Sequence, residues 1–299
     1  MKRSRSIAAC ILAFAAMILA SCATKAPVSA QNPLPAAESQ AKASPKAAKQ
    51  RTVIAKFPVL VKETSMYSDG LVDEFIVYKM DAANKNLIEK ATFDASRPDP
   101  IERLVPEYKD GRLASESLYE TDGKLRLRRE LGYDAAGNLV SERVLDAGGK
   151  VQSSSAYAYD ADGRKTEWRA LDGAGSVKAI SSYSYGKKDL IGVEMKDSGG
   201  KTTGAIKLEY SDGALAKRSY FGADKALQKY EAYVYAGGRL SALEYRRADA
   251  SLSSKMTYEY GPSGELVKSA ELDSSGALKG YSVYEYVVRE DSSIETYYE

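Results

Sequence analysis

A repeated phrase that ends in a tyrosine constrains the fold of this chain more than any other feature. YAYDADGR, at residues 157–164, is one copy, and its final tyrosine returns every 25 or 26 residues. A related phrase, such as VLDAGGKV at residues 144–151, lies halfway between the copies. This double spacing predicts a unit of one strand plus one turn, repeated along the chain. The repeating tyrosines are Tyr108, Tyr133, Tyr159, Tyr185, Tyr210, Tyr235, Tyr260 and Tyr286.

The residues after these strands have the composition of tight turns. Asp160 and Gly163 occupy the first and fourth positions of a type I turn, where Asp bonds nearby backbone and Gly accepts the left-handed conformation. Tyr210-Ser-Asp-Gly and Tyr235-Ala-Gly-Gly suit two-residue hairpins instead. Counting outward from the turns predicts these cross-strand pairs: Tyr133 with Leu139, Tyr210 with Leu215, Tyr235 with Leu240, Tyr260 with Leu266, Leu145 with Val151, Leu171 with Val177, and Leu272 with Leu278.

The pairs place the tyrosines and leucines on one side of the sheet, which we call the tyrosine face, and we call the other side the polar face. About 17 strands would make a very wide flat sheet, but strand twist curls a long meander over its apolar side. We therefore predict an all-β fold: an antiparallel meander of hairpin repeats of about 25 residues, curled into a spiral or barrel-like shell. A free-standing flat sheet is the alternative.

The phrases YAYDADGRKTEW, GYDAAGNLVSE and YEYGPSGELVKS resemble the YD repeats of RHS-type bacterial cell-surface proteins. The resemblance covers roughly residues 108–286. It implies a β-shell built from hairpins, exposure at the cell surface and, in some members, contact with carbohydrate. The chain departs from the repeat after Tyr185, Tyr210, Tyr235 and Tyr260, where the Asp is absent. No catalytic residue is carried over.

The N-terminus reads as a bacterial export signal. Lys2, Arg3 and Arg5 precede an apolar run over residues 7–20, which is too short for a spanning helix. Leu19-Ala20-Ser21-Cys22 resembles the lipobox of bacterial lipoproteins. We therefore expect residues 1–21 to be a lipoprotein signal peptide and Cys22 to carry the lipid, and Ala23 after it favours sorting to the outer membrane. An ordinary signal peptide is the alternative.

Composition divides the remaining chain into two parts. Residues 22–52 hold the lipidated Cys and a disordered tether of Ala, Pro and Lys, and residues 53–299 form the β-hairpin repeat domain. Of the 43 basic and 41 acidic residues, eight basic and one acidic precede residue 53, which leaves the repeat domain at a net charge of −5. Because nucleic acid binding requires clustered positive charge, it is not expected.

Several kinds of chemistry are disfavoured by the residues themselves. The chain has no histidine, and its only cysteines are Cys10 and Cys22, so we expect no metal site and no cofactor. Asp160-Ala-Asp162-Gly163 is better explained by a turn than by a calcium loop. A glycoside hydrolase built on carboxylates such as Glu142 and Glu271, which counting places on the polar face, is a less favoured alternative to a protein that is no enzyme.

A membrane-spanning barrel is also disfavoured. The predicted register puts charges at mid-strand on the tyrosine face, and strands of about eight residues are short for crossing a bilayer. The charges are Arg129, Arg143, Arg169 and Glu231.

The favoured function is a binding or interaction surface for a glycan or a protein, anchored by Cys22 to the outer membrane and facing the periplasm or the cell surface. A purely structural envelope protein is the alternative. If a ligand patch exists, the register predicts it on the polar face, with Tyr230 opposite Tyr245 and Tyr220 diagonal to Tyr230. Trp168, expected opposite Ala156 and Ile180, is a second candidate. The predicted ligand-binding residues are Arg218, Tyr220, Tyr230, Leu243 and Tyr245.

Overall fold

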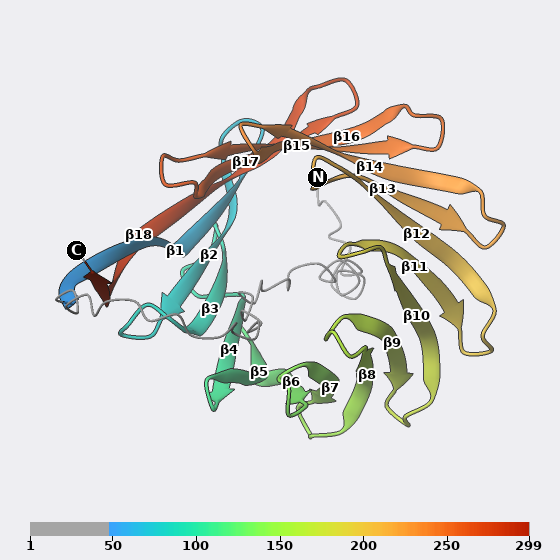
Figure 1. The fold of residues 1–299 in the computed structure, drawn as a ribbon, viewed down its shortest axis with the longest axis horizontal. Coiled ribbons are helices and arrows are strands. Elements are labelled where there is room, and N and C mark those ends of the chain that lie inside the picture. Colours follow the sequence, from blue (N-terminus) through green and yellow to red (C-terminus); the bar gives the residue numbers. More distant parts are fainter. Residues whose placement is uncertain (1–47, 299) are drawn as a thin grey trace, which may run out of the picture. The chain divides into compact units, whose positions relative to one another are not determined.

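The structure, a computed structural model, describes residues 48–298, with side chains from Gln50 to Glu295. The predicted signal peptide, Cys22 and most of the predicted tether lie outside these residues. The part of the chain that is described contains only strands and turns (Figure 1). Within it, no helix is long and apolar enough to cross a membrane.

Eighteen strands form one sheet. Strand β1 begins at Ala48, so residues 48–52, which composition assigned to the tether, belong to a strand. The strands are β1 (Ala48–Tyr67), β2 (Val72–Met80), β3 (Leu87–Asp94), β4 (Glu102–Lys109), β5 (Arg112–Glu120), β6 (Leu125–Tyr133), β7 (Leu139–Asp146), β8 (Val151–Tyr159), β9 (Lys165–Asp172), β10 (Val177–Tyr185), β11 (Leu190–Asp197), β12 (Thr202–Ser211), β13 (Ala214–Gly222), β14 (Leu227–Ala236), β15 (Arg239–Arg247), β16 (Leu252–Tyr260), β17 (Leu266–Asp273) and β18 (Leu278–Tyr298).

Each strand pairs with its neighbours in the chain, and the sheet closes on itself. Pairing is antiparallel from β1 through β18, and β1 pairs with both β2 and β18. The predicted all-β meander, curled into a barrel-like shell, is confirmed, and the alternative of an open flat sheet is wrong. Closure removes the unpaired edges that an open sheet of this width would expose.

The predicted turns are present. Gly137, Gly149, Gly163 and Gly276 all have positive φ angles, between 75° and 90°. In the turn of the opening phrase, the Asp160 carboxylate accepts hydrogen bonds from the backbone N–H groups of Asp162 and Arg164. All seven predicted cross-strand pairs beside the turns are confirmed, from Tyr133 with Leu139 to Leu272 with Leu278.

A β-bulge next to nearly every turn shifts the register beyond these pairs. Tyr133 lies opposite Leu139, but the preceding residue, Gly132, lies opposite Ser141, so one residue of β7 has no partner. A shift of one residue moves side chains to the other face of a strand. The bulges therefore reverse the faces predicted for mid-strand residues on the strands that follow the tyrosines.

The tyrosine hydroxyls bind the hairpins to one another. The Tyr159 hydroxyl donates to the backbone carbonyl of Leu139, the residue beside the bulge of the preceding hairpin. Such carbonyls need a partner because a bulge disrupts the ladder locally. Seven hydrogen bonds of this kind, each spanning 20 residues and 2.8 to 3.0 Å long, join Tyr133, Tyr159, Tyr185, Tyr210, Tyr235, Tyr260 and Tyr286 to the carbonyls of Leu113, Leu139, Lys165, Leu190, Leu215, Leu240 and Leu266. We call this series the tyrosine ladder.

The two faces of the sheet differ in burial. On the tyrosine face, the side chains of Arg129 and Glu142 are 23% and 13% exposed. On the polar face, those of Arg128 and Glu107 are 37% and 56% exposed. Small residues of the polar face are buried nonetheless: Ser115 and Ser117, which lie opposite Glu107 and Arg128, are 3% and 4% exposed.

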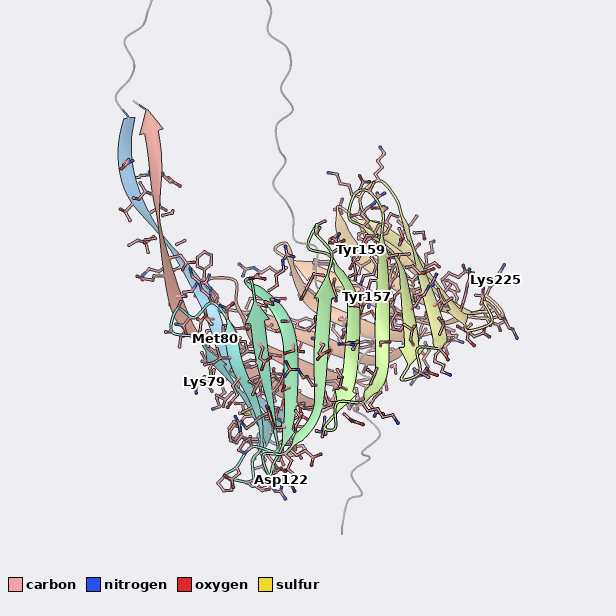
Figure 2. The ribbon with its side chains drawn as sticks, turned by 90° about the horizontal axis from the view of Figure 1, so that it is seen from below. Lys79, Met80, Asp122, Tyr157, Tyr159 and Lys225 are labelled. Carbon is pink, nitrogen blue, oxygen red and sulfur yellow. The ribbon has the colours of Figure 1, made fainter. Side chains whose placement is uncertain are left out.

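Strands β1 and β18 are 20 and 21 residues long, about twice the length of the others. Figure 2 shows the two strands continuing together beyond the rest of the sheet as a two-stranded ribbon. Two ion pairs cross the ribbon, Arg51 with Glu295 and Lys56 with Glu290. A third, Lys62 with Glu285, joins the two strands where β1 also pairs with β2.

Candidate functional site

The structure brings together four of the five predicted ligand-binding residues, but on the tyrosine face and not on the polar face. Arg218 and Tyr220 lie on β13 with Leu243 and Tyr245 nearby on β15. Tyr230 lies on the polar face of β14, between them. The predicted register was wrong: Tyr230 lies opposite Arg246 and Ser219, while Tyr245 lies opposite Glu231.

A bulge between Val234 and Tyr235 explains the error. Tyr235 pairs with Leu240 as predicted, but Val234 pairs with Ala242, so the mid-strand residues of β15 are displaced by one position. As a result, Tyr245 moves to the same face as Tyr233, and the aromatic pair across β14 and β15 does not form.

Glu231, which sequence analysis did not include in the patch, is the centre of the actual cluster. Its carboxylate lies 3.1 Å from Nη1 of Arg218. The same carboxylate accepts hydrogen bonds from the hydroxyls of Tyr220, at 2.6 Å, and Tyr233, at 2.8 Å. We call these four residues the Glu231 cluster. Their polar groups are partnered inside the cluster, as burial requires.

Burial keeps the tyrosines of the Glu231 cluster protonated. It raises the pKa of Tyr220 to about 12, with a further contribution from the hydrogen bond to Glu231. The pKa of Tyr233 is raised by the same two causes. A tyrosine is protonated at neutral pH even with its ordinary pKa of 10.0, so both hydroxyls act as donors there, and the raised pKa values extend this to alkaline pH. Tyr245, whose side chain is 36% exposed, presents an aromatic surface beside the cluster.

A second cluster lies on β5 to β8 of the same face, and we call it the Arg129 cluster. The Arg129 guanidinium lies 2.6 Å from the carboxylate of Glu116 and 2.9 Å from that of Glu142. Glu142 also accepts a 2.7 Å hydrogen bond from the hydroxyl of Tyr157, a residue of β8 (Figure 2). The guanidinium thus neutralises two carboxylates that are largely withdrawn from solvent.

The mid-strand charges are distributed differently from the prediction. Glu142 and Glu271 lie on the tyrosine face, because they oppose Leu131 and Met256. Arg143 and Arg169 lie on the polar face, where they pair with Glu130 and Glu167. Of the predicted charges on the tyrosine face, Arg129 and Glu231 are confirmed.

Glu142 and Glu271, the carboxylates considered for hydrolysis, belong to β7 and β17. A retaining or inverting glycosidase needs two facing carboxyl groups, one of them free to carry a proton. Glu142 is instead held by an arginine and a tyrosine. Among the described residues, no group of His, Cys, Asp and Glu side chains is arranged to hold a metal ion.

Trp168, the chain's only tryptophan, also lies on the tyrosine face. It opposes Tyr157 and Ser181, and the predicted partners Ala156 and Ile180 both oppose Arg169 instead. The ammonium group of Lys165 is close by, 4.7 Å from the ring centre of Tyr157 and 5.7 Å from that of Tyr183. Sequence analysis missed Lys165, although it stands where the other repeats have leucine.

A family model described as RHS Repeat matches residues 133–177. These residues are similar to the RHS repeat. The repeat extends from the end of β6 to the beginning of β10 and includes Tyr157, Lys165 and Trp168. It confirms the resemblance that the tyrosine phrases indicated.

Several solved structures are similar to the chain at low sequence identity. A porin-like protein from Bacteroides uniformis is 12% identical, with a TM-score of 0.44 over 77% of this chain and 98% of the other. The Tc holotoxin pore from Photorhabdus luminescens is 14% identical, with a TM-score of 0.27, and the match covers 73% of this chain but 14% of the toxin chain. No curated protein matches the chain in sequence.

Proposed function

We propose that the protein is a binding module of the bacterial cell envelope that holds a glycan on its tyrosine face without catalysing a reaction. The observation that carries this proposal is the side-by-side placement of a partly exposed aromatic ring, Tyr245, and the fixed charges and hydroxyls of the Glu231 cluster. Rings that are apolar on their surface, next to oriented polar groups, suit a sugar ring with its hydroxyls.

The carboxylates of the tyrosine face support a role in binding more than one in catalysis. Glu142 and Glu231 each contact an arginine and accept tyrosine hydrogen bonds. A general acid or base must reach the reacting atoms, and these carboxylate oxygens are occupied by partners within the protein. The absence of histidine from the chain agrees with this assignment.

Lipidation at Cys22 would hold the module on the outer membrane, facing the periplasm or the cell surface. The lipobox-like sequence and the RHS repeat both favour an envelope location. Cys22→Ser is expected to move the protein from the membrane fraction to the soluble fraction while leaving its circular dichroism unchanged. If the variant partitions with membranes like the wild type, the anchor is not at Cys22.

A purely structural envelope protein is the second candidate, and the tyrosine ladder favours it. The ladder uses seven tyrosine hydroxyls to connect hairpins, and the two charged clusters are partnered internally. In that case the tyrosine face would stabilise the shell and bind no ligand.

A binding assay separates the two candidates. Full-length protein in detergent would be passed over immobilised peptidoglycan and envelope polysaccharides, with Tyr245→Ala compared with Tyr230→Ala on the polar face. Binding lost only in Tyr245→Ala, at an unchanged melting temperature, supports the proposal. No binding by the wild type, or equal loss in both variants, contradicts it. Release of reducing sugar would instead indicate a hydrolase.

A further inference from the structure

Lys165 breaks the pattern of the repeat. It pairs with Tyr159 beside the turn, in the position that faces each repeating tyrosine. Its backbone carbonyl accepts the hydroxyl of Tyr185, so its place in the tyrosine ladder does not depend on its side chain. The other members of this series are leucine: Leu113, Leu139, Leu190, Leu215, Leu240 and Leu266.

The ammonium group of Lys165 is half-buried without an anion of its own. It lies over the rings of Tyr157 and Tyr183 and forms no ion pair with a described residue. The nearby carboxylate of Glu142 acts on it through its charge but is bound by Arg129 and Tyr157. Burial lowers the pKa of Lys165, because charge is disfavoured away from water. Two ring faces offset only part of that cost.

A second polar group beside the ammonium also lacks a partner. The Tyr183 hydroxyl is buried and makes no hydrogen bond. A buried hydroxyl without a partner is costly, and native structures rarely keep one without a reason. Trp168 lies across Ser181, two residues from Tyr183 on the same strand and face. Trp168 also lies opposite Tyr157, the residue whose ring the Lys165 ammonium contacts, and its indole provides a flat apolar surface.

We propose that Lys165, Tyr183 and Trp168 form a binding site for a sugar that carries a carboxylate, such as a uronic acid. The ammonium would pair with the carboxylate, and the Tyr183 hydroxyl would donate to it or to a ring oxygen. The sugar ring would pack against Trp168 and Tyr157.

The charges of the site favour a carboxylate over a phosphate. Lys165 is a single cation, which balances one negative charge. The neighbouring guanidinium of Arg164 is already paired with Asp160 and Asp162. The charge of Glu142 acts on Lys165, where it raises the pKa against the effect of burial, and it would repel a second negative charge. A monoanionic sugar therefore fits the local balance of charge better than a phosphorylated one.

The site is separate from the Glu231 cluster and rests on the proposed function only in placing a ligand on the tyrosine face.

The fluorescence of Trp168 provides the assay, since no other tryptophan contributes. Full-length protein in detergent would be titrated with sodium glucuronate, and with glucose and sodium chloride as controls. We expect a saturable change with glucuronate alone.

Lys165→Leu restores the residue of the other repeats and is expected to keep the melting temperature while losing at least tenfold in affinity. Lys178→Leu, which removes a cation that pairs with Asp172, is the matched control and should respond like the wild type. Tyr183→Phe should weaken binding several-fold without lowering the melting temperature.

No response to glucuronate, or an equal response in Lys165→Leu, overturns the assignment. The proposed function is tested separately, by the binding of Tyr245→Ala to envelope polysaccharides. A negative result with glucuronate would leave that test unaffected, so the two proposals can fail separately.

Discussion

The hydroxyl of Tyr159 donates a 2.8 Å hydrogen bond to the backbone carbonyl of Leu139, a residue of the preceding hairpin. The same contact recurs at the same separation of 20 residues along the sheet. The ladder tyrosines from Tyr133 to Tyr260 therefore have two structural roles: each pairs beside the turn with a leucine, or in the case of Tyr159 with Lys165, and each hydroxyl partners a carbonyl beside a bulge. The spacing of 25 or 26 residues keeps both roles in register.

Tyr159→Phe tests the tyrosine ladder. Removing the hydroxyl leaves a partly buried carbonyl without a donor, which should lower the free energy of unfolding by about 1 kcal/mol. Tyr235→Phe should have a smaller effect, because Tyr235 is 40% exposed and water can replace its hydroxyl. Urea denaturation of both variants measures the difference, and equal effects would contradict the prediction.

Two neighbouring glycines in one turn provide a matched test of turn geometry. Gly149 has a φ angle of 82°, and an added Cβ would meet no atom within 4 Å. Gly149→Ala should therefore destabilise through the backbone alone, by about 1 kcal/mol. Gly148 lies outside the left-handed region, so Gly148→Ala should cost less. If thermal unfolding ranks the two variants in the opposite order, the role assigned to Gly149 is wrong.

Arg129 and Arg128 are adjacent but lie on opposite faces. Arg129→Leu would leave Glu116 and Glu142 unpaired in a largely buried cluster and should destabilise by about 3 kcal/mol. Arg128→Leu removes an exposed pair with Glu107 and should cost less than about 1 kcal/mol. Chemical denaturation distinguishes them, and similar losses would show that the tyrosine face is as well solvated as the polar face.

Alkaline pH should unfold the protein through its tyrosines. Burial raises the pKa of Tyr78, Tyr183, Tyr220 and Tyr258 to about 12, above the ordinary value of 10.0. Their contribution to stability is complete below pH 10 and is lost as the pH rises towards 12, since the unfolded chain ionises first. Lys165, with a lowered pKa, acts in the opposite direction but is a single group, whereas the pKa values of Tyr157 and Tyr233 are raised as well.

Melting temperatures measured from neutral pH upward, together with the ultraviolet absorbance of tyrosinate, test this expectation. Tyrosines that ionise near pH 10 while the circular dichroism of the sheet is unchanged would contradict it.

Sequence reasoning predicted the strands, the turns and the pairs beside the turns because those features are local. Asp160 and Gly163 specify a turn within four residues, and Tyr133 and Leu139 are joined by one hairpin. The pairing of β1 with β18, which closes the sheet, was harder to predict, since nothing in the sequence of either strand identifies the other as its partner.

The candidate site was misplaced because a bulge has no strong residue signature. One unpaired residue beside Tyr235 was enough to move Tyr245 to the other face, and a similar shift moved Glu142. Lys165 could have been found, because aligning the repeats places it in a column of leucines. That Lys165 has no ion-pair partner, and that the Tyr183 hydroxyl has no hydrogen-bond partner, could be recognised only in the structure.

The pairing of β1 with β18 sets an order of events for the nascent chain. Hairpins form from neighbouring residues, but the contact between Arg51 and Glu295 spans 244 positions and must wait for the last strand to be synthesised. Until then, β1 and the newest strand are open edges that can recruit other chains. A chain that lacks β18 would keep two open sheet edges and would thus be a template for aggregation.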